Sequence, residues 1–128
     1  MRTRLALAVA LAGLFAATVA NAYMGSSKRA PARLLVQGTE YRLQLSRGTL
    51  KRGPALIQFV NRGQDPHDLR LRRIGASASR TVSVPETRAG GLVEFDARLE
   101  SGRYRLWCSL PGHDQRGMHA VLTVRRGR

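Results

Sequence analysis

A thiol, an imidazole and a thioether lie close together near the end of the chain. Cys108, His113 and Met118 follow one another with the spacing Cys-x4-His-x4-Met. Two of these three donors are soft sulfur atoms, which favour copper over harder ions. A mononuclear electron-transfer copper site typically has two histidines and a cysteine in one plane, with a weak axial methionine. The motif therefore needs one more histidine.

His67 is the candidate for that position, because it follows the turn-rich segment 61–66 and begins an alternating segment. The remaining histidine, His119, is adjacent to Met118. Successive side chains of a strand point to opposite faces. The apolar residues that would share a face with a donor are Leu69 and Leu71 for His67, Tyr104 and Leu106 for Cys108, and Ala120, Leu122 and Val124 for Met118. We therefore expect these three donors to point into a core and His119 to point to solvent.

The segments that must position the donors have the pattern of β-strands. Apolar and polar residues alternate through 41–46 and 93–96, and turns rich in Gly and Pro separate such segments. No stretch of the sequence shows a convincing helical periodicity. About seven to eight short strands separated in this way predict an all-β, antiparallel sandwich over residues 34–128.

Composition limits the classes of protein that remain. The chain has 128 residues, with 22 lysines and arginines against 8 acidic residues, for a formal net charge of +14. These values predict one modest domain with a basic surface. A single cysteine cannot form an internal disulfide, so in an oxidising compartment Cys108 must be protected, reactive or bound to metal. The sequence has no nucleophile and base pair and no paired carboxylates, so we expect no enzyme activity and no small-molecule substrate.

The first 22 residues have the features of a secretory signal peptide. Arg2 and Arg4 precede an uncharged apolar run at 5–19, and the sequence ANA ending at Ala22 fits a cleavage site. We expect cleavage near Ala22 and a periplasmic or extracellular protein, with a retained membrane anchor as the alternative. Cleavage removes two arginines and no acid, so the formal charge falls from +14 to +12. Residues 23–33 are small, polar and basic, and we expect them to form a flexible tether.

From Leu34 to Arg125 the chain resembles the cupredoxins, the small blue copper proteins. The resemblance rests on two motifs, Asn61-x-Gly63-x3-His67-Asp68-Leu69 and Tyr104-x-Leu106-x-Cys108-x2-Pro111-Gly112-His113-x4-Met118. The spacing of the second motif is similar to that of rusticyanin and auracyanin more than to that of plastocyanin. The resemblance implies a Greek-key sandwich in which His67, Cys108, His113 and Met118 hold one copper ion, Cu(I) or Cu(II). Asp68 departs from the family pattern, because well-studied members often have Asn there, whose amide can donate as well as accept.

The resemblance implies an exported one-electron carrier that acts between redox proteins, with the loop residue His113 as the exit for the electron. The alternative is a copper-handling protein that stores or delivers the ion. Delivery sites for Cu(I) tend toward several methionines, whereas only Met24 and Met118 remain after cleavage at Ala22. This count favours the carrier.

The charge of the chain predicts the kind of partner. Arg103, Arg105 and Trp107 share the outward face of the strand that ends at Cys108, so we expect this face to dock an acidic redox partner. The same charge would allow contact with an anionic membrane surface. We expect no nucleic-acid binding, because the chain is exported and its donors are buried, and we expect a monomer.

Overall fold

A computed structural model describes residues 29–127 of the chain. Within this range the chain forms nine β-strands and no helix. The strands are β1 (Ala32–Thr39), β2 (Arg42–Leu45), β3 (Thr49–Lys51), β4 (Gly53–Asn61), β5 (His67–Arg73), β6 (Val82–Thr87), β7 (Leu92–Leu99), β8 (Gly102–Trp107) and β9 (His119–Arg125). The predicted all-β class is confirmed. The strands outnumber the seven or eight expected, since elements as short as β3 leave little alternation in a sequence.

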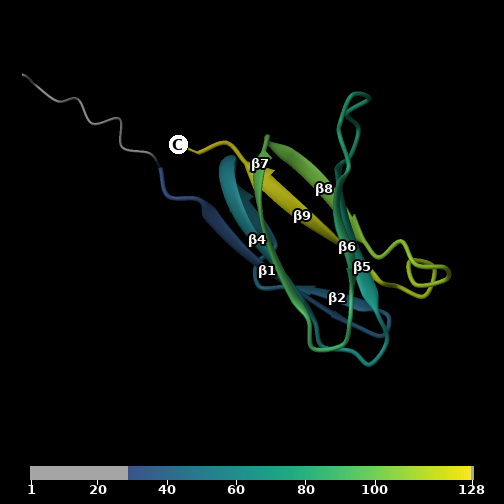
Figure 1. Ribbon diagram of the computed structural model, residues 1–128. Coiled ribbons are helices and arrows are strands. Elements are labelled where there is room, and N and C mark those ends of the chain that lie inside the picture. The colour runs from purple at the N-terminus through teal and green to yellow at the C-terminus, as the bar shows by residue number, and fades with distance from the viewer. Residues whose placement is uncertain (1–28, 128) are drawn as a thin grey trace, which may run out of the picture.

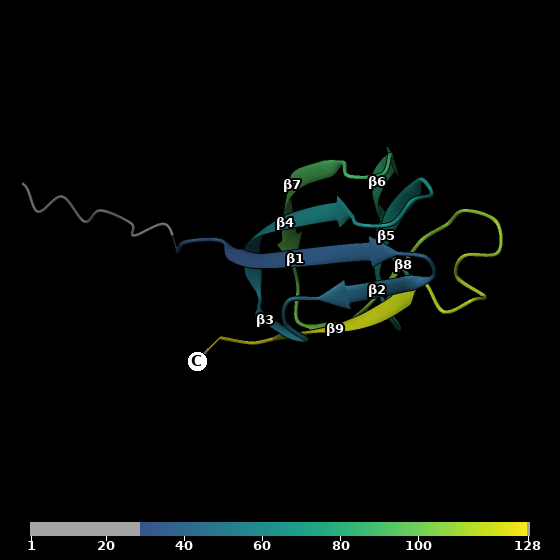
Figure 2. The same ribbon diagram turned by 90° about the horizontal axis from the view of Figure 1, so that it is seen from below.

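The described strands form two sheets that face each other (Figure 1). One sheet has the order β2-β1-β4-β7, and the other has the order β3-β9-β8-β5-β6. Figure 2 looks onto the first sheet, where β1 lies between β2 and β4. The sandwich is not purely antiparallel as expected, because β1 pairs with β4 and β3 pairs with β9 in parallel. After β2 the chain crosses to β3 in the other sheet and then returns to the first sheet, where β4 runs in the same direction as β1.

Alternating apolar residues of both sheets fill the space between them. The side chains that are almost fully buried include Leu34, Val36, Ile57, Phe59, Leu69, Leu71, Leu106 and Leu122. Their burial confirms the strand parities expected for β5, β8 and β9. Burial of these side chains supplies most of the free energy that holds the two sheets together, at about 25 cal/mol per Å² of apolar surface.

The two ends of the sandwich differ. The 108–118 loop, which connects β8 with β9, projects at one end (Figure 1). The described chain enters β1 and leaves β9 at the opposite end (Figure 2). The expected leader and most of the expected tether lie outside the described residues, and β1 begins at Ala32. Among residues 29–127 we find no helix that is long and apolar enough to span a membrane.

Candidate metal centre

Three of the expected donors meet at the end of the sandwich that carries the 108–118 loop. His67 is the first residue of β5, Cys108 directly follows β8, and His113 lies in the loop. One donor atom from each residue lies within 4.8 Å of the other two. Nδ1 of His67 is 3.2 Å from Nδ1 of His113, and Sγ of Cys108 is 3.6 Å from the same nitrogen. His67 and Cys108 are fully buried, as their parity predicted.

These separations fit one shared metal ion. Imidazole nitrogen and thiolate sulfur bind metals such as zinc at about 2.0 and 2.3 Å. Two donors bound at those lengths and at a near-tetrahedral angle lie about as far apart as His113 lies from His67 and from Cys108. The two facing Nδ1 atoms also have only two ways to avoid lone-pair repulsion, since they must share a proton or bind a common cation.

Backbone hydrogen bonds place Met118 beside this cluster. The N–H of Met118 donates to the carbonyl of His113 at 3.0 Å, and the carbonyl of Met118 accepts from the N–H of Cys108 at 3.1 Å. The Met118 side chain is fully buried, as expected. Its methyl group lies over Gly38, where an added Cβ would be 3.1 Å from Cε. Gly38 thus leaves the space that Met118 needs.

Two glycines with positive φ set the turns before the loop donors. Gly112, with a φ of 80°, directly precedes His113, and Gly117, with a φ of 108°, directly precedes Met118. Residues with a Cβ rarely adopt this region. The sequence PGHDQRGM therefore has glycine where the loop reverses toward each donor.

Known structures share this architecture. No protein-family model and no curated protein sequence matches the chain. Auracyanin from Roseiflexus castenholzii, reduced with dithionite, superposes with a TM-score of 0.61 at 16% identity, over 75% of this chain and 98% of that one. Rusticyanin from Thiobacillus ferrooxidans superposes with a TM-score of 0.59 at 14% identity, over 73% of this chain and 76% of that one. Auracyanin A from Chloroflexus aurantiacus, described as a "blue" copper protein, has a TM-score of 0.57 at 16% identity, over 75% of this chain and 100% of that one.

The chain has the cupredoxin fold. Identities this low establish the architecture alone. Within that architecture, the donors His67, Cys108, His113 and Met118 are placed as in a site for one copper ion.

In this cupredoxin fold Asp68 joins the two segments that carry the donors, and it shares one face of β5 with Arg70, whose guanidinium lies 3.1 Å from its carboxylate. A bulge between His67 and Leu69 shifts the strand register, and Asp68 is buried. Its carboxylate accepts hydrogen bonds from the Ser109 backbone N–H at 2.6 Å and from the Ser109 hydroxyl. Burial alone would raise the pKa of Asp68, but the Ser109 bonds and the nearby Arg70 outweigh burial and hold it below its ordinary value. Asp68 thus links the segment of His67 to the segment of Cys108 by accepting hydrogen bonds.

The Cys108 thiol is in an environment that keeps its proton in the absence of a cation. Burial raises the pKa of the thiol above its ordinary value, backbone hydrogen bonds from Asp68 and Leu110 lower it, and the Asp68 carboxylate raises it. The thiolate is the form that binds metal. A metal ion that enters this site must therefore displace the thiol proton.

Sequence reasoning assigned no role to two side chains that shape the site, Asn61 and Glu40. Asn61 is buried and ties the 61–66 turn, because its amide donates to the carbonyls of Asp65 and Thr87 at 2.7 and 2.8 Å. Glu40, in the turn between β1 and β2, has its Oε1 atom 3.3 Å from Nε2 of His67. Glu40 is 27 residues from His67 in the sequence, so no local spacing could have pointed to it.

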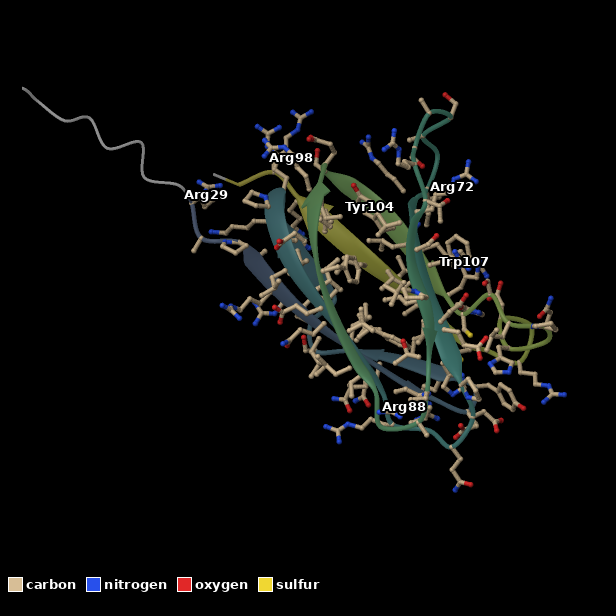
Figure 3. The ribbon with its side chains drawn as sticks, in the orientation of Figure 1. Arg29, Arg72, Arg88, Arg98, Tyr104 and Trp107 are labelled. Carbon is tan, nitrogen blue, oxygen red and sulfur yellow. The ribbon has the colours of Figure 1, made fainter. Side chains whose placement is uncertain are left out.

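The outward residues of the site region also have partners. His119 is exposed, and its Nδ1 lies 2.9 Å from the Asp114 carboxylate, so it takes no part in the cluster. Arg105 binds the same carboxylate at 2.7 Å and lies 5.6 Å from the centre of the Trp107 ring. Trp107 lies on β8 toward the loop end, far from Arg98 and Arg29 (Figure 3). Part of the expected basic docking face is therefore neutralised within the molecule.

Proposed function

We propose that this protein is an exported type 1 copper protein that carries single electrons between redox proteins. The observation that supports the proposal is the cluster of His67, Cys108 and His113, whose donor atoms lie within 4.8 Å of one another. His67 and His113 would supply neutral imidazole nitrogens, Cys108 a thiolate, and Met118 a weak axial thioether. Copper bound there supplies one-electron chemistry between Cu(I) and Cu(II).

The frame around these residues supports electron transfer because it limits their movement. His67 begins β5, which has a neighbouring strand on each side, and Cys108 and Met118 are linked through their backbones. Donors that are held by packing and hydrogen bonds keep one arrangement when the charge of a bound ion changes. His113 is the half-buried member of the cluster, and its ring meets Tyr41 edge-on with centroids 5.1 Å apart. The His113 edge is therefore the exit that we propose for the electron.

The first experiment asks whether the protein binds copper in this way. One equivalent of Cu(II), added to protein whose thiol has been kept reduced, should produce an intense blue or green colour from thiolate-to-copper charge transfer. Cys108→Ser should abolish the colour, since a hydroxyl cannot replace the sulfur donor. Met24→Leu is the matched control, because it changes the other methionine of the processed chain and should keep the colour. A wild-type protein that stays colourless would contradict the proposal.

A second experiment separates the carrier from a protein that stores or delivers copper. A carrier should exchange electrons rapidly with small redox reagents and keep its ion through many cycles. A delivery protein should instead release Cu(I) to a competing chelator within the same period. The single methionine among the described residues, Met118, favours the carrier.

The remaining expectations are part of the same proposal. Residues 1–22 would be removed near Ala22, and the segment between the cleavage site and β1, which begins at Ala32, would act as a tether. The domain would work in the periplasm or outside the cell, without enzyme activity. The exposed large apolar residues of the described chain are Ile74, Leu92 and Val121, which lie on different elements. Scattered apolar residues are normal on a monomer. Mass spectrometry of the secreted protein would test the cleavage site, and sedimentation would test the monomer.

A further inference from the structure

The Glu40 carboxylate is fixed against the segment that leads into His67. Its Oε1 atom accepts from the backbone N–H groups of Gln64 and Asp65 at 2.7 and 2.9 Å. The same oxygen lies 3.3 Å from Nε2 of His67. A Cβ built on Gly63 would be 2.2 Å from Oε1, so the carboxylate fills the space that the missing side chain leaves. The two backbone donors hold Glu40 in place independently of His67.

This contact determines which nitrogen of His67 carries the proton. The ring is fully buried, so solvent cannot bind either nitrogen. Nε2 faces an anionic acceptor and must be a donor, since a bare nitrogen would meet the carboxylate lone pairs. Nδ1 is then the nitrogen with a free lone pair, and it is the one that faces His113.

We infer that Glu40 is a positioning residue that holds His67 as the Nε2–H tautomer and, through its negative charge, strengthens the imidazole as a ligand for the oxidised ion. This inference rests on the proposed copper function. A carboxylate that accepts a hydrogen bond from one ring nitrogen of a ligating histidine orients the ring and raises the basicity of the other nitrogen, which binds the metal. A more basic nitrogen and a nearby negative charge both favour Cu(II) over Cu(I). Glu40 should therefore lower the reduction potential of the site.

Glu40→Gln tests the charge without removing the shape. The amide oxygen of glutamine can still accept from the N–H groups of Gln64 and Asp65, so the turn is retained. We expect the preference for Cu(II) over Cu(I) to fall about tenfold, which corresponds to a rise in reduction potential of ~59 mV for one electron. Glu94→Gln makes the same charge change on β7, where Glu94 contacts Gln58. Equal potentials for the two variants would overturn the inference.

A measurement on the copper-free protein tests the tautomer separately. Nitrogen-15 NMR of the His67 ring should show the Nε2–H tautomer in the wild type, and Glu40→Gln should weaken the hydrogen bond and move the Hε2 resonance upfield. An Nδ1–H tautomer in the wild type would overturn the inference even if copper binds. If the protein binds no copper, the proposed function fails, while the ring tautomer still decides whether Glu40 holds His67.

A second, independent observation concerns the end of the sandwich opposite the donors. A cavity of about 790 Å³ lies there beside the start of β1 and the end of β9. We call it the basic pocket, and its cationic lining residues are Arg29, Arg47, Lys51, Arg52, Arg125 and Arg126. No acidic residue lines it, and none of these six forms an ion pair within residues 29–127. Six exposed cations around one cavity make it a surface that attracts anions.

We propose that the basic pocket docks the protein on phosphate groups of an anionic membrane surface. Arginine pairs with phosphate through two parallel N–H groups, and clustered cations next to an anionic bilayer add their attractions. The floor includes Ala32, Leu50 and Pro54, but no aromatic side chain on which nucleic-acid bases could stack. Arg29 and Arg98 lie at this end in Figure 3, away from the 108–118 loop. Docking here would leave the His113 edge free.

Vesicle binding of the processed protein tests this proposal. The protein should sediment with vesicles that contain phosphatidylglycerol and not with vesicles of phosphatidylcholine alone. Lys51→Glu with Arg52→Glu should weaken this binding by more than about tenfold. Arg42→Glu with Arg72→Glu makes the same charge change at exposed residues outside the pocket, and this control should bind nearly as the wild type. Equal losses in both variants, or tighter binding to an oligonucleotide or to free phosphate than to the vesicles, would overturn the proposal.

Discussion

The Asp68 carboxylate accepts a 2.6 Å hydrogen bond from the backbone N–H of Ser109. This bond joins the residue after His67 to the residue after Cys108, so two segments that are 41 residues apart keep a fixed distance. A hydrogen bond to a charged acceptor in a buried setting is among the stronger ones in proteins. Asp68 therefore connects the stability of the fold with the geometry of the donor cluster.

Asp68→Ala should destabilise the copper-free protein by about 1–3 kcal/mol, because it removes the buried carboxylate that accepts from both the N–H and the hydroxyl of Ser109. Ser109→Ala is the matched control, since it removes the hydroxyl bond and keeps the backbone bond, and it should cost about 0.5–1.5 kcal/mol. Urea denaturation of both variants measures the free energy of unfolding. A loss in Asp68→Ala no larger than in Ser109→Ala would show that the backbone bond contributes little.

Gly38→Ala should disturb the position of Met118. A Cβ at this position would lie 3.1 Å from Cε of Met118 and 3.2 and 3.3 Å from two atoms of the Phe59 ring. Overpacking of this kind typically costs about 1–3 kcal/mol, and a displaced axial sulfur should change the EPR spectrum of the copper protein. At Gly48 an added Cβ would meet nothing within 4 Å, so Gly48→Ala should change neither property. An unchanged spectrum in Gly38→Ala would contradict the assignment of Met118 as a ligand.

The two histidines at positions 113 and 119 give opposite expectations. His113→Ala should abolish the visible absorption band, because it removes one of the three clustered donors. His119→Ala should leave the band and the copper affinity nearly unchanged, since His119 points outward and contacts Asp114. Copper titrations followed by absorption would measure both variants. Equal losses would mean that β9 is shifted by one residue from the register described here.

The sequence was sufficient for those parts of the site that follow a local rule. Alternation along β5, β8 and β9 predicted the inward direction of His67, Cys108 and Met118, because burial of one strand face leaves only one register. The burial of Asp68 could not be predicted in this way, because it comes from the segment after β8, where Ser109 donates two hydrogen bonds to its carboxylate. Alternation also could not predict that β1 and β4 pair in parallel, because it does not indicate the direction of a strand.

Contacts between distant segments could not be read from spacing. The turn that carries Glu40 and the strand that carries His67 belong to different sheets, and only the packing of the two sheets brings them together. Asn61 is similar, since its bond to the Thr87 carbonyl depends on how β4 and β6 end side by side. A charged side chain in a turn, such as that of Glu40, is usually expected to face solvent. The residues next to Glu40 in the sequence give no sign that it contacts a buried histidine.

The last prediction concerns how charge steers partners to the donor end. Arg103 begins the outward face of β8 and lies five residues before Cys108, or about 17 Å along an extended strand. Charges at such a distance are largely screened at physiological ionic strength, where the screening length is about 8 Å. Arg116 is exposed in the 108–118 loop, with its guanidinium 4.6 Å from the centre of the Tyr41 ring, which in turn contacts His113.

Arg116→Glu should therefore slow oxidation of the copper protein by the anionic reagent hexacyanoferrate(III) several-fold at low salt. Arg103→Glu makes the same charge change and should have much less effect. Stopped-flow absorbance at the copper band would measure the second-order rates, and the wild-type rate should fall as salt rises. If Arg103→Glu slows the reaction as much as Arg116→Glu, steering depends on the net charge of the chain, and electrons need not leave at the His113 edge.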